Sequence, residues 1–292
     1  MIAVRVFLLA MGLSIALTGR SEGHMSGAVS TVIVPSGGVE LRARLFYPSG
    51  QGPFPAVLFN HGSGHTGGVW VGGREHRHPE LLGPVFARHG YVFLYLYRRG
   101  DGLSAGQGIP SGDVMDEAFA SGGQVARNQI QLRLLEGDEM NDVTAGLAYL
   151  RALQEVDRTR IAVVGHSFGG SLTVLLAEHD PAIRAIVTFG TGGYSWVQSA
   201  PLRARLTTAV GRMSASAFFI HAENDYSIRA GTELGAEMAR LRKPHRVKTY
   251  PAVGQTAAQG HDFIHLRISI WEPDVFTFLN EQMRNAVGNT VR

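Results

Sequence analysis

The chain has 292 residues, of which 45% are hydrophobic and 17% charged, and a chain of this composition buries an apolar core rather than staying disordered. Its formal net charge of +3 falls short of the dense basic surface that nucleic-acid-binding proteins carry, so we expect no nucleic-acid partner. The absence of cysteine excludes disulfides, zinc–thiolate sites and thiol catalysis.

The first 25 residues have the features of a secretory signal peptide. Arg5 precedes an apolar run that extends to Gly19 and is short for a transmembrane span. Arg20 stands where a lipoprotein would carry its lipidated cysteine, which excludes lipidation there. We therefore expect export to the periplasm or the medium, with no stable membrane insertion once residues 1–25 are removed. The alternatives are a membrane-anchored protein with an uncleaved segment, or a cytoplasmic protein whose start is misassigned upstream of Met25.

Residues 28–292 contain no linker or repeat, and we expect them to form one catalytic domain. The segments 31–34 and 39–47 flank a Pro-Ser-Gly-Gly turn, and the second alternates apolar residues with arginines, which predicts an antiparallel hairpin. Continuous apolar runs typical of strands buried on both faces follow it. They lie at 54–59, 91–97, 161–164, 183–189 and 215–220.

Helical spacing of apolar residues between these runs predicts helices around 140–150, 234–241 and 272–284. The predicted fold class is therefore α/β, with a mostly parallel central sheet, helices on both of its faces and the antiparallel N-terminal hairpin. Two stretches near 101–129 and 194–212 follow strands and are longer than the connections that a minimal α/β fold needs. We expect them to be lid-like insertions that cover a site.

The strongest chemical signal is the segment Gly-His-Ser-Phe-Gly-Gly at 165–170. It has the pattern G-x-S-x-G between an apolar strand and a helical run, the context of a nucleophile elbow. The glycines are needed because side chains beside such a sharp turn would collide with neighbouring backbone. We predict that Ser167 is a nucleophile, held beside the positive end of the following helix.

A serine hydroxyl needs a general base, and the base needs an acid that holds it in place. Asp225 lies just past the predicted strand 215–220 and is the expected acid, with Glu223 as the alternative. His261 follows a glycine near the C-terminus and is the expected base. His265 is the alternative, but its apolar neighbours favour a buried structural role.

Two backbone N–H groups are expected to bind the oxyanion of an acyl-transfer reaction. One belongs to Phe168, which directly follows the nucleophile. The other belongs to Ser63, in the segment Asn-His-Gly-Ser-Gly at 60–64 that follows the predicted strand 54–59.

Together these motifs resemble those of the α/β-hydrolase superfamily, in particular the dienelactone-hydrolase-like and prolyl-oligopeptidase-like serine esterases. The similarity covers nearly all of residues 30–285. It implies an α/β-hydrolase fold, a triad of Ser167, Asp225 and His261, and oxyanion donors at Ser63 and Phe168. True dienelactone hydrolases use cysteine where this chain has serine, a departure that bears on the substrate class. The motifs are HGSG at 61–64, RRGDGLS at 98–104, GHSFGG at 165–170, END at 223–225 and GHDF at 260–263.

The expected reaction is hydrolysis of a small-molecule carboxylic ester through an acyl-enzyme intermediate, without a cofactor. A small-substrate peptidase or amidase, a lactone hydrolase and a non-catalytic binding protein are the alternatives. An apolar acyl or aryl pocket is expected to include Tyr97, Phe119, Tyr194 and Trp196.

A metal site is not expected. The segment Glu-His-Arg-His at 75–78, with His61 and His65 upstream, lacks the spacing of a helical H-E-x-x-H motif. A solvated or substrate-facing loop is the expected role of this histidine-rich stretch.

Overall fold

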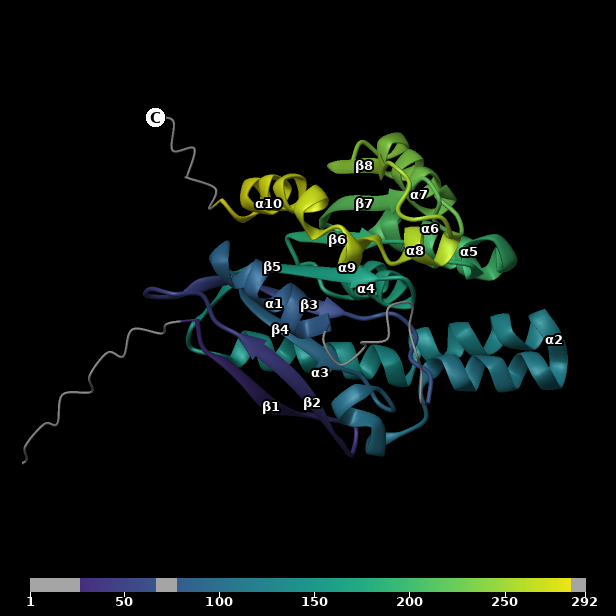
Figure 1. Cartoon of the computed structure of the whole chain (residues 1–292), viewed down its shortest axis with the longest axis horizontal. Helices are drawn as coiled ribbons and strands as arrows, with labels where there is room; N and C mark the ends of the chain where they lie inside the picture. Colours follow the sequence, from purple (N-terminus) through teal and green to yellow (C-terminus); the bar gives the residue numbers. More distant parts are fainter. Residues whose placement is uncertain (1–26, 67–77, 285–292) are drawn as a thin grey trace, which may run out of the picture.

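A mixed sheet of eight strands forms the centre of the structure, a computed structural model that describes residues 27–66 and 78–284 (Figure 1). The strand order is β1-β2-β4-β3-β5-β6-β7-β8. β2 pairs antiparallel with both β1 and β4, and every other neighbouring pair is parallel. The strands are β1 Val29–Ser36, β2 Val39–Phe46, β3 Phe54–Asn60, β4 Val92–Tyr97, β5 Val156–His166, β6 Ala185–Phe189, β7 Ser216–Ala222 and β8 His245–Tyr250.

The hydropathy pattern of each strand matches its place in the sheet. In β2, Leu41, Ala43 and Leu45 are buried, while the arginines between them are partly exposed, as expected for a hairpin with one solvated face. All residues of β4 are buried, because helices cover both faces of the sheet there. The predicted hairpin and parallel strands are confirmed, and the predicted signal segment 1–25 lies outside the described residues.

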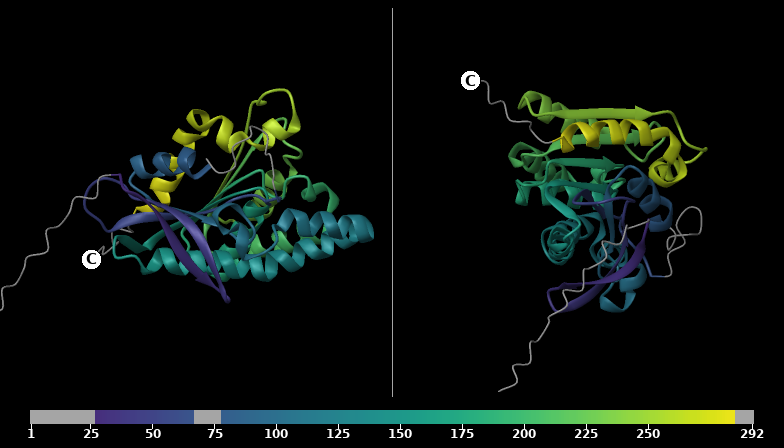
Figure 2. Two further views of the ribbon diagram at one scale, coloured as in Figure 1. Left: turned by 60° about the horizontal axis from the view of Figure 1, so that its bottom comes forward. Right: turned by 90° about the vertical axis from the view of Figure 1, so that its left-hand side faces the viewer.

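Helices cover the sheet on both sides (Figure 2). α1 and α10 pack their aromatic and aliphatic side chains on one face. α3, α4, α6 and α7 pack on the other. This arrangement confirms the predicted α/β-hydrolase fold. The helices are α1 His78–Arg88, α3 Asp138–Ala152, α4 Phe168–His179, α6 Ala200–Arg212, α7 Arg229–Arg240 and α10 Ile268–Met283.

Both segments expected to be insertions contain helices. The first contains the short helix η2 (Gly102–Gln107) and the first half of α2 (Ser111–Glu136). The backbone turns at Gly122 and Gly123, the latter with φ of +64°, so α2 is a hairpin of two helical halves that projects at one end of the molecule (Figure 1). The second segment forms α5 (Ser195–Gln198) and α6.

The α2 hairpin contacts α5 and α6 beside it. Asn128 Nδ2 donates to the backbone oxygen of Gln198 over 3.0 Å, and Arg205 of α6 pairs with Glu136 at the end of α2. The carboxyl ends of β5 and β7 lie close to this group of helices (Figure 1). The hairpin therefore stands where a substrate approaching the strand ends would meet it.

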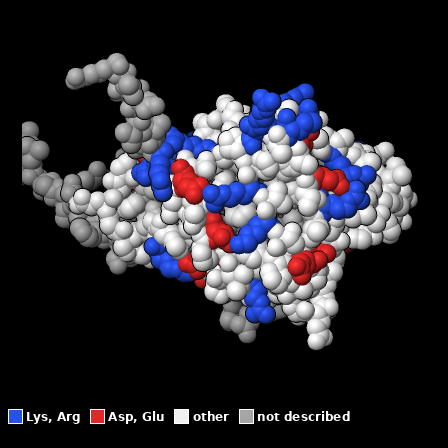
Figure 3. All heavy atoms as spheres, turned by 90° about the horizontal axis from the view of Figure 1, so that it is seen from above, with Lys and Arg blue, Asp and Glu red and all other residues white. Residues whose placement is uncertain are grey.

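The surface around α10 and β8 carries acidic and basic side chains next to one another (Figure 3). Ion pairs with arginine and lysine join α10 to its neighbours: Arg88–Glu272, Lys248–Asp274 and Arg246–Glu281. None of the helices within residues 27–66 and 78–284 has the length and hydropathy needed to cross a membrane.

Candidate active site

Ser167 occupies a strained turn between β5 and α4. Its φ of +56° and ψ of −118° place it in a region that non-glycine residues rarely adopt. A Cβ on Gly165 would lie 2.3 Å from Thr173 Oγ1, and a Cβ on Gly169 would lie 2.1 Å from the backbone oxygen of Asn60. Both glycines are therefore required by close approach, and the turn presents Ser167 at the N-terminus of α4, as the motif predicts.

Asp225 and His261 lie side by side after neighbouring parallel strands. Asp225 follows β7, and His261 is the last residue of the short helix α8 (Ala257–His261), which comes after β8. His261 Nδ1 donates to Asp225 Oδ1 over 2.7 Å. The sequence predicted His261 in a loop, whereas a capping box formed by Thr256 and Gln259 nucleates a helical turn there.

A second histidine holds the other oxygen of Asp225. His221 Nδ1 lies 2.9 Å from Asp225 Oδ2, and the N–H of Gly231 donates to His221 Nε2 over 3.2 Å. Because Nε2 accepts, the proton of the neutral ring is on Nδ1, where it can be donated to the carboxylate. Burial raises the pKa of Asp225, but the hydrogen bonds from His221 and His261 outweigh it and hold the pKa below its usual range.

Sequence reasoning missed His221. Its only signal is its position four residues before Asp225, at the end of a buried strand.

Ser167 and His261 face a common space beside Gly193. A Cβ on Gly193 would lie 3.2 Å from both Ser167 Oγ and His261 Nε2. Gly193 also has φ of +46°, so backbone conformation and space both favour glycine there. Since Nδ1 of His261 is bonded to Asp225, Nε2 is the nitrogen directed to the serine side.

The two predicted oxyanion donors belong to residues that line one cavity with Ser167 and His261. Its volume is about 320 Å³, and Ser63 and Phe168 are among its lining residues. The structure thus brings together in one place all five residues that the sequence assigned to the reaction.

A buried arginine, missed as a site residue by the sequence, holds the loop that carries Ser63. Arg98 donates from Nη1 to the backbone oxygen of His61 over 2.9 Å and from Nη2 to that of Gly62 over 2.8 Å. Its Nε pairs with the carboxylate of Glu139, which is also buried. With its carbonyls bound in this way, the loop keeps a fixed backbone orientation beside Phe168.

Of the four predicted substrate contacts, the structure brings only Tyr194 to the cavity. Phe119, on α2, is exposed and does not line it. Tyr97 is buried in the core with its ring 5.2 Å from that of Tyr95, because its position on β4 points to the face that α1 and α10 cover. Trp196 is fully buried, and its Nε1 donates to Glu233. The lining residues that sequence reasoning missed include Met115, Arg127 and Gln131 of α2, together with Tyr226. His65, from the histidine-rich stretch expected to be solvated or substrate-facing, also lines the cavity.

The two alternative triad members lie elsewhere. Glu223 is exposed. The carboxylate that accepts from His261 Nδ1 belongs to Asp225. His265 belongs to α9 (Phe263–Leu266), is buried, and its Nδ1 donates to Asp262 Oδ1 over 2.6 Å. Neither residue lines the cavity of Ser167.

Comparison with known proteins decides the family. Residues 41–264 match the family model described as the dienelactone hydrolase family. The chain belongs to the dienelactone hydrolase family. Among solved structures of this family, dienelactone hydrolase from Anabaena variabilis superposes with a TM-score of 0.58 at 16% identity, covering 88% of this chain and 99% of that one.

The chain is also similar to proteins with other names. Acylaminoacyl peptidase of Pyrococcus horikoshii superposes with a TM-score of 0.61 at 17% identity, over 91% of this chain and 44% of that chain. Est1E of Butyrivibrio proteoclasticus, solved with ferulic acid, gives a TM-score of 0.61 at 18% identity, over 86% and 98% of the two chains. The quorum-quenching protein AidA of Acinetobacter baumannii is 24% identical over 170 residues, 58% of this chain and 46% of AidA.

The chain therefore spans less than half the length of AidA and of the peptidase. The family model shows the family of this chain, and the solved structures show its fold.

Proposed function

We propose that the protein is a serine-dependent hydrolase of carboxylic esters. The observation that carries this proposal is the arrangement of Ser167 and His261 around one small space, with His261 paired to a buried Asp225. A strained serine at a helix N-terminus, a histidine of defined tautomer and a buried carboxylate are the parts of an acyl-transfer triad.

Each residue has a definite step in the proposed reaction. Ser167 Oγ attacks the ester carbonyl while His261 Nε2 takes its proton, and the C–O bond to the alcohol breaks as His261 returns that proton to the leaving oxygen. The backbone N–H groups of Ser63 and Phe168 bind the oxyanion of each tetrahedral intermediate. A water activated by His261 then hydrolyses the acyl-enzyme and releases the acid.

The cavity favours esters of a short acyl or aryl acid. Its volume of about 320 Å³ is at the low end for small-molecule sites. Tyr194, Tyr226 and Met115 supply aromatic and apolar surface. Arg127 contributes a cation, which is paired with Asp116 within the α2 hairpin. His65 and Gln131 add further polar groups to the walls. The cavity therefore suits a compact acyl group with polar as well as apolar parts better than a long chain.

The deciding experiment is hydrolysis of p-nitrophenyl esters from acetate to long-chain acids by the wild type and by Ser167→Ala. We expect turnover that is highest for short acyl groups in the wild type and lower by about a thousandfold or more in the variant. Ser214→Ala is the matched control, because Ser214 is an exposed serine between α6 and β7.

A fluorophosphonate probe gives an independent reading, since it should label Ser167 alone. Equal activity in the wild type and Ser167→Ala would refute the proposed nucleophile. Labelling of Ser167 without ester turnover would instead favour an amide or peptide substrate on the same triad.

A further inference from the structure

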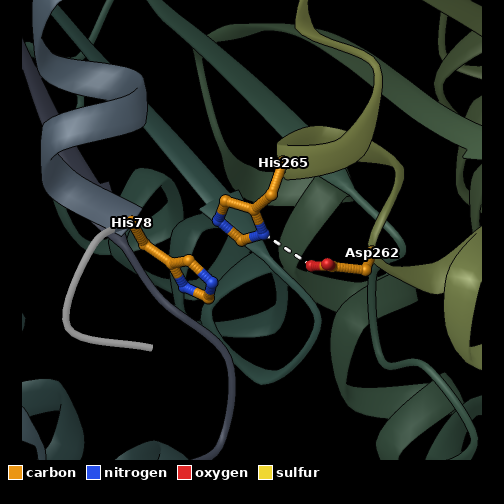
Figure 4. A group of neighbouring side chains, drawn as sticks. All are labelled: His78, Asp262 and His265. Carbon is orange, nitrogen blue, oxygen red and sulfur yellow. Dashed lines mark hydrogen bonds and ion pairs between the residues drawn. The ribbon is translucent and has the colours of Figure 1, made fainter. Parts of the chain in front are cut away.

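A second group of imidazoles lies outside the cavity of Ser167. His78, the first residue of α1, stacks on His265 of α9 with ring centroids 3.7 Å apart and an interplanar angle of 14°. Figure 4 shows the two rings next to each other and the bond from His265 to Asp262. Each of these three residues can offer a ligand atom within 4.8 Å of the others.

His265 leaves one nitrogen unpaired. Its side chain is only 5% exposed, and Nε2 has no hydrogen-bond partner within residues 27–66 and 78–284. Since Nδ1 donates to Asp262, Nε2 of the neutral ring carries a lone pair and no proton. A buried acceptor of this kind is costly unless something donates to it or coordinates it.

A small enclosed space adjoins these groups. Besides His78, Asp262 and His265, its lining includes His61 and His166. Its volume of about 10 Å³ is enough for roughly one particle the size of a water molecule. We call this space, with those five residues, the histidine pocket.

We propose that the histidine pocket binds one divalent first-row transition-metal ion, through Nε2 of His265 and a ring nitrogen of His78. Imidazole nitrogens are preferred ligands of Zn²⁺, Co²⁺ and Ni²⁺. A carboxylate that accepts from the other nitrogen of a ligating histidine fixes its tautomer and orientation, and Asp262 has this position toward His265. Water completes the coordination shell.

Metal binding requires the two rings to leave their parallel stack, because lone pairs on parallel rings do not converge on one ion. His265 is buried and bonded to Asp262, whereas His78 is only partly buried at the start of α1. His78 is therefore the ring that turns. The ion then links α1 to α9 and raises the stability of the folded state by mass action.

This ion would not touch the reacting atoms. His166 donates from Nε2 to the backbone oxygen of His261 over 2.9 Å, and its ring lies between the histidine pocket and His261. Binding is therefore measurable without reference to ester turnover, and its failure would leave the proposed function intact.

The test is titration of the chelator-treated full chain with Zn²⁺, followed by calorimetry and by thermal unfolding. We expect a single site in the wild type and a Tm that rises with Zn²⁺ concentration. His78→Ala should weaken the affinity by about tenfold or more, and Asp262→Asn by about tenfold. His179→Ala is the control for the loss of an exposed histidine and should bind like the wild type.

A measurement on the wild type alone protects the test against variants that fail to fold. In ¹H–¹⁵N spectra of histidine side chains, Zn²⁺ should shift the Nε2 resonance of His265 and the resonances of His78. Co²⁺ should give visible absorption bands of a nitrogen- and oxygen-liganded ion. The proposal is overturned if the wild type binds no Zn²⁺, if the His265 resonance does not move, or if folded His78→Ala keeps the affinity of the wild type.

Discussion

Two imidazole–carboxylate pairs of the same local chemistry lie close together in this molecule and face different surroundings. His261 donates Nδ1–H to Asp225 over 2.7 Å, and His265 donates Nδ1–H to Asp262 over 2.6 Å. Nε2 of His261 faces Ser167 and an open cavity, whereas Nε2 of His265 faces the enclosed histidine pocket. The carboxylate fixes the tautomer in both pairs, and the group opposite Nε2 determines what chemistry the ring can perform.

The pairs also differ in how firmly their carboxylates are held. Asp225 accepts from two histidines, and the second of these, His221, is itself fixed by the N–H of Gly231. Burial raises the pKa of Asp262, and nearby histidines lower it by less. A carboxylate that stays ionised is what an imidazolium formed during catalysis requires.

The largest expected effect separates the two histidines directly. His261→Ala should lower ester kcat/KM by about a thousandfold or more, because it removes the general base. His265→Ala should retain most of the activity and lose stability, because it leaves a buried Asp262 without its donor. Urea unfolding together with ester kinetics on both variants checks this. An equal loss of activity in two well-folded variants would show that the comparison is wrong.

His221 should have the next largest effect. His221→Ala removes one of the two donors that orient Asp225, and we expect kcat to fall by about tenfold to a hundredfold with little change in KM. His221→Asn keeps an N–H donor in about the same place and should recover part of the loss. A change in KM with kcat unchanged, or the same kcat in both variants, would show that His221 only fills space.

As the pH falls, the buried histidines should destabilise the folded protein at a higher pH than the carboxylates do. Burial lowers the pKa of His166 to about 3, so the unfolded chain takes up a proton near its usual pKa of about 6.5 while the folded chain does not. The contribution of His166 to the free energy of unfolding is therefore fully present above about pH 6.5. It falls as the pH drops toward 3, by at most about 1.4 kcal/mol per pH unit. Burial also lowers the pKa of His61, which acts in the same direction.

Urea midpoints measured with a chelator between about pH 8 and about pH 5 check this expectation. His166→Gln should flatten the slope, because it removes one titrating group. Asp225, whose pKa is held low, adds a further loss only below its unfolded pKa of about 4. A stability that stays constant from about pH 8 to about pH 5 would contradict the neutral, buried state of His166.

The parts of the site that the sequence predicts are those with local signals. The Ser167 turn depends on glycines within two residues of it, and Asp225 and His261 each follow a recognisable strand. Arg98 and His221 were missed as site residues because their roles depend on orientation: Arg98 reaches carbonyls 36 and 37 residues away. No spacing rule shows where such a side chain points.

The same limit explains why predicted substrate contacts lie away from the cavity in the structure. Every residue of β4 is apolar, so periodicity does not tell which face Tyr97 occupies. The stretch near 101–129 is rich in glycine, yet it contains η2 and part of the α2 hairpin, whose turn uses Gly122 and Gly123. Glycine there marks a reversal between two helical halves, and a sequence without a clear apolar stripe does not reveal them.

Tyr194 should give the smallest effect and the finest test of the cavity. It is 56% exposed, lines the cavity and accepts a hydrogen bond from Gln198 Nε2 through its hydroxyl. Tyr194→Ala should raise KM for aryl esters by a few-fold, roughly 1 kcal/mol or less, and leave kcat unchanged, because the ring binds ground and transition states alike. Phe119→Ala is the control, since Phe119 is similarly exposed but does not line the cavity. A change in kcat rather than KM would place Tyr194 among the groups that orient His261, toward which its neighbour Tyr226 already packs.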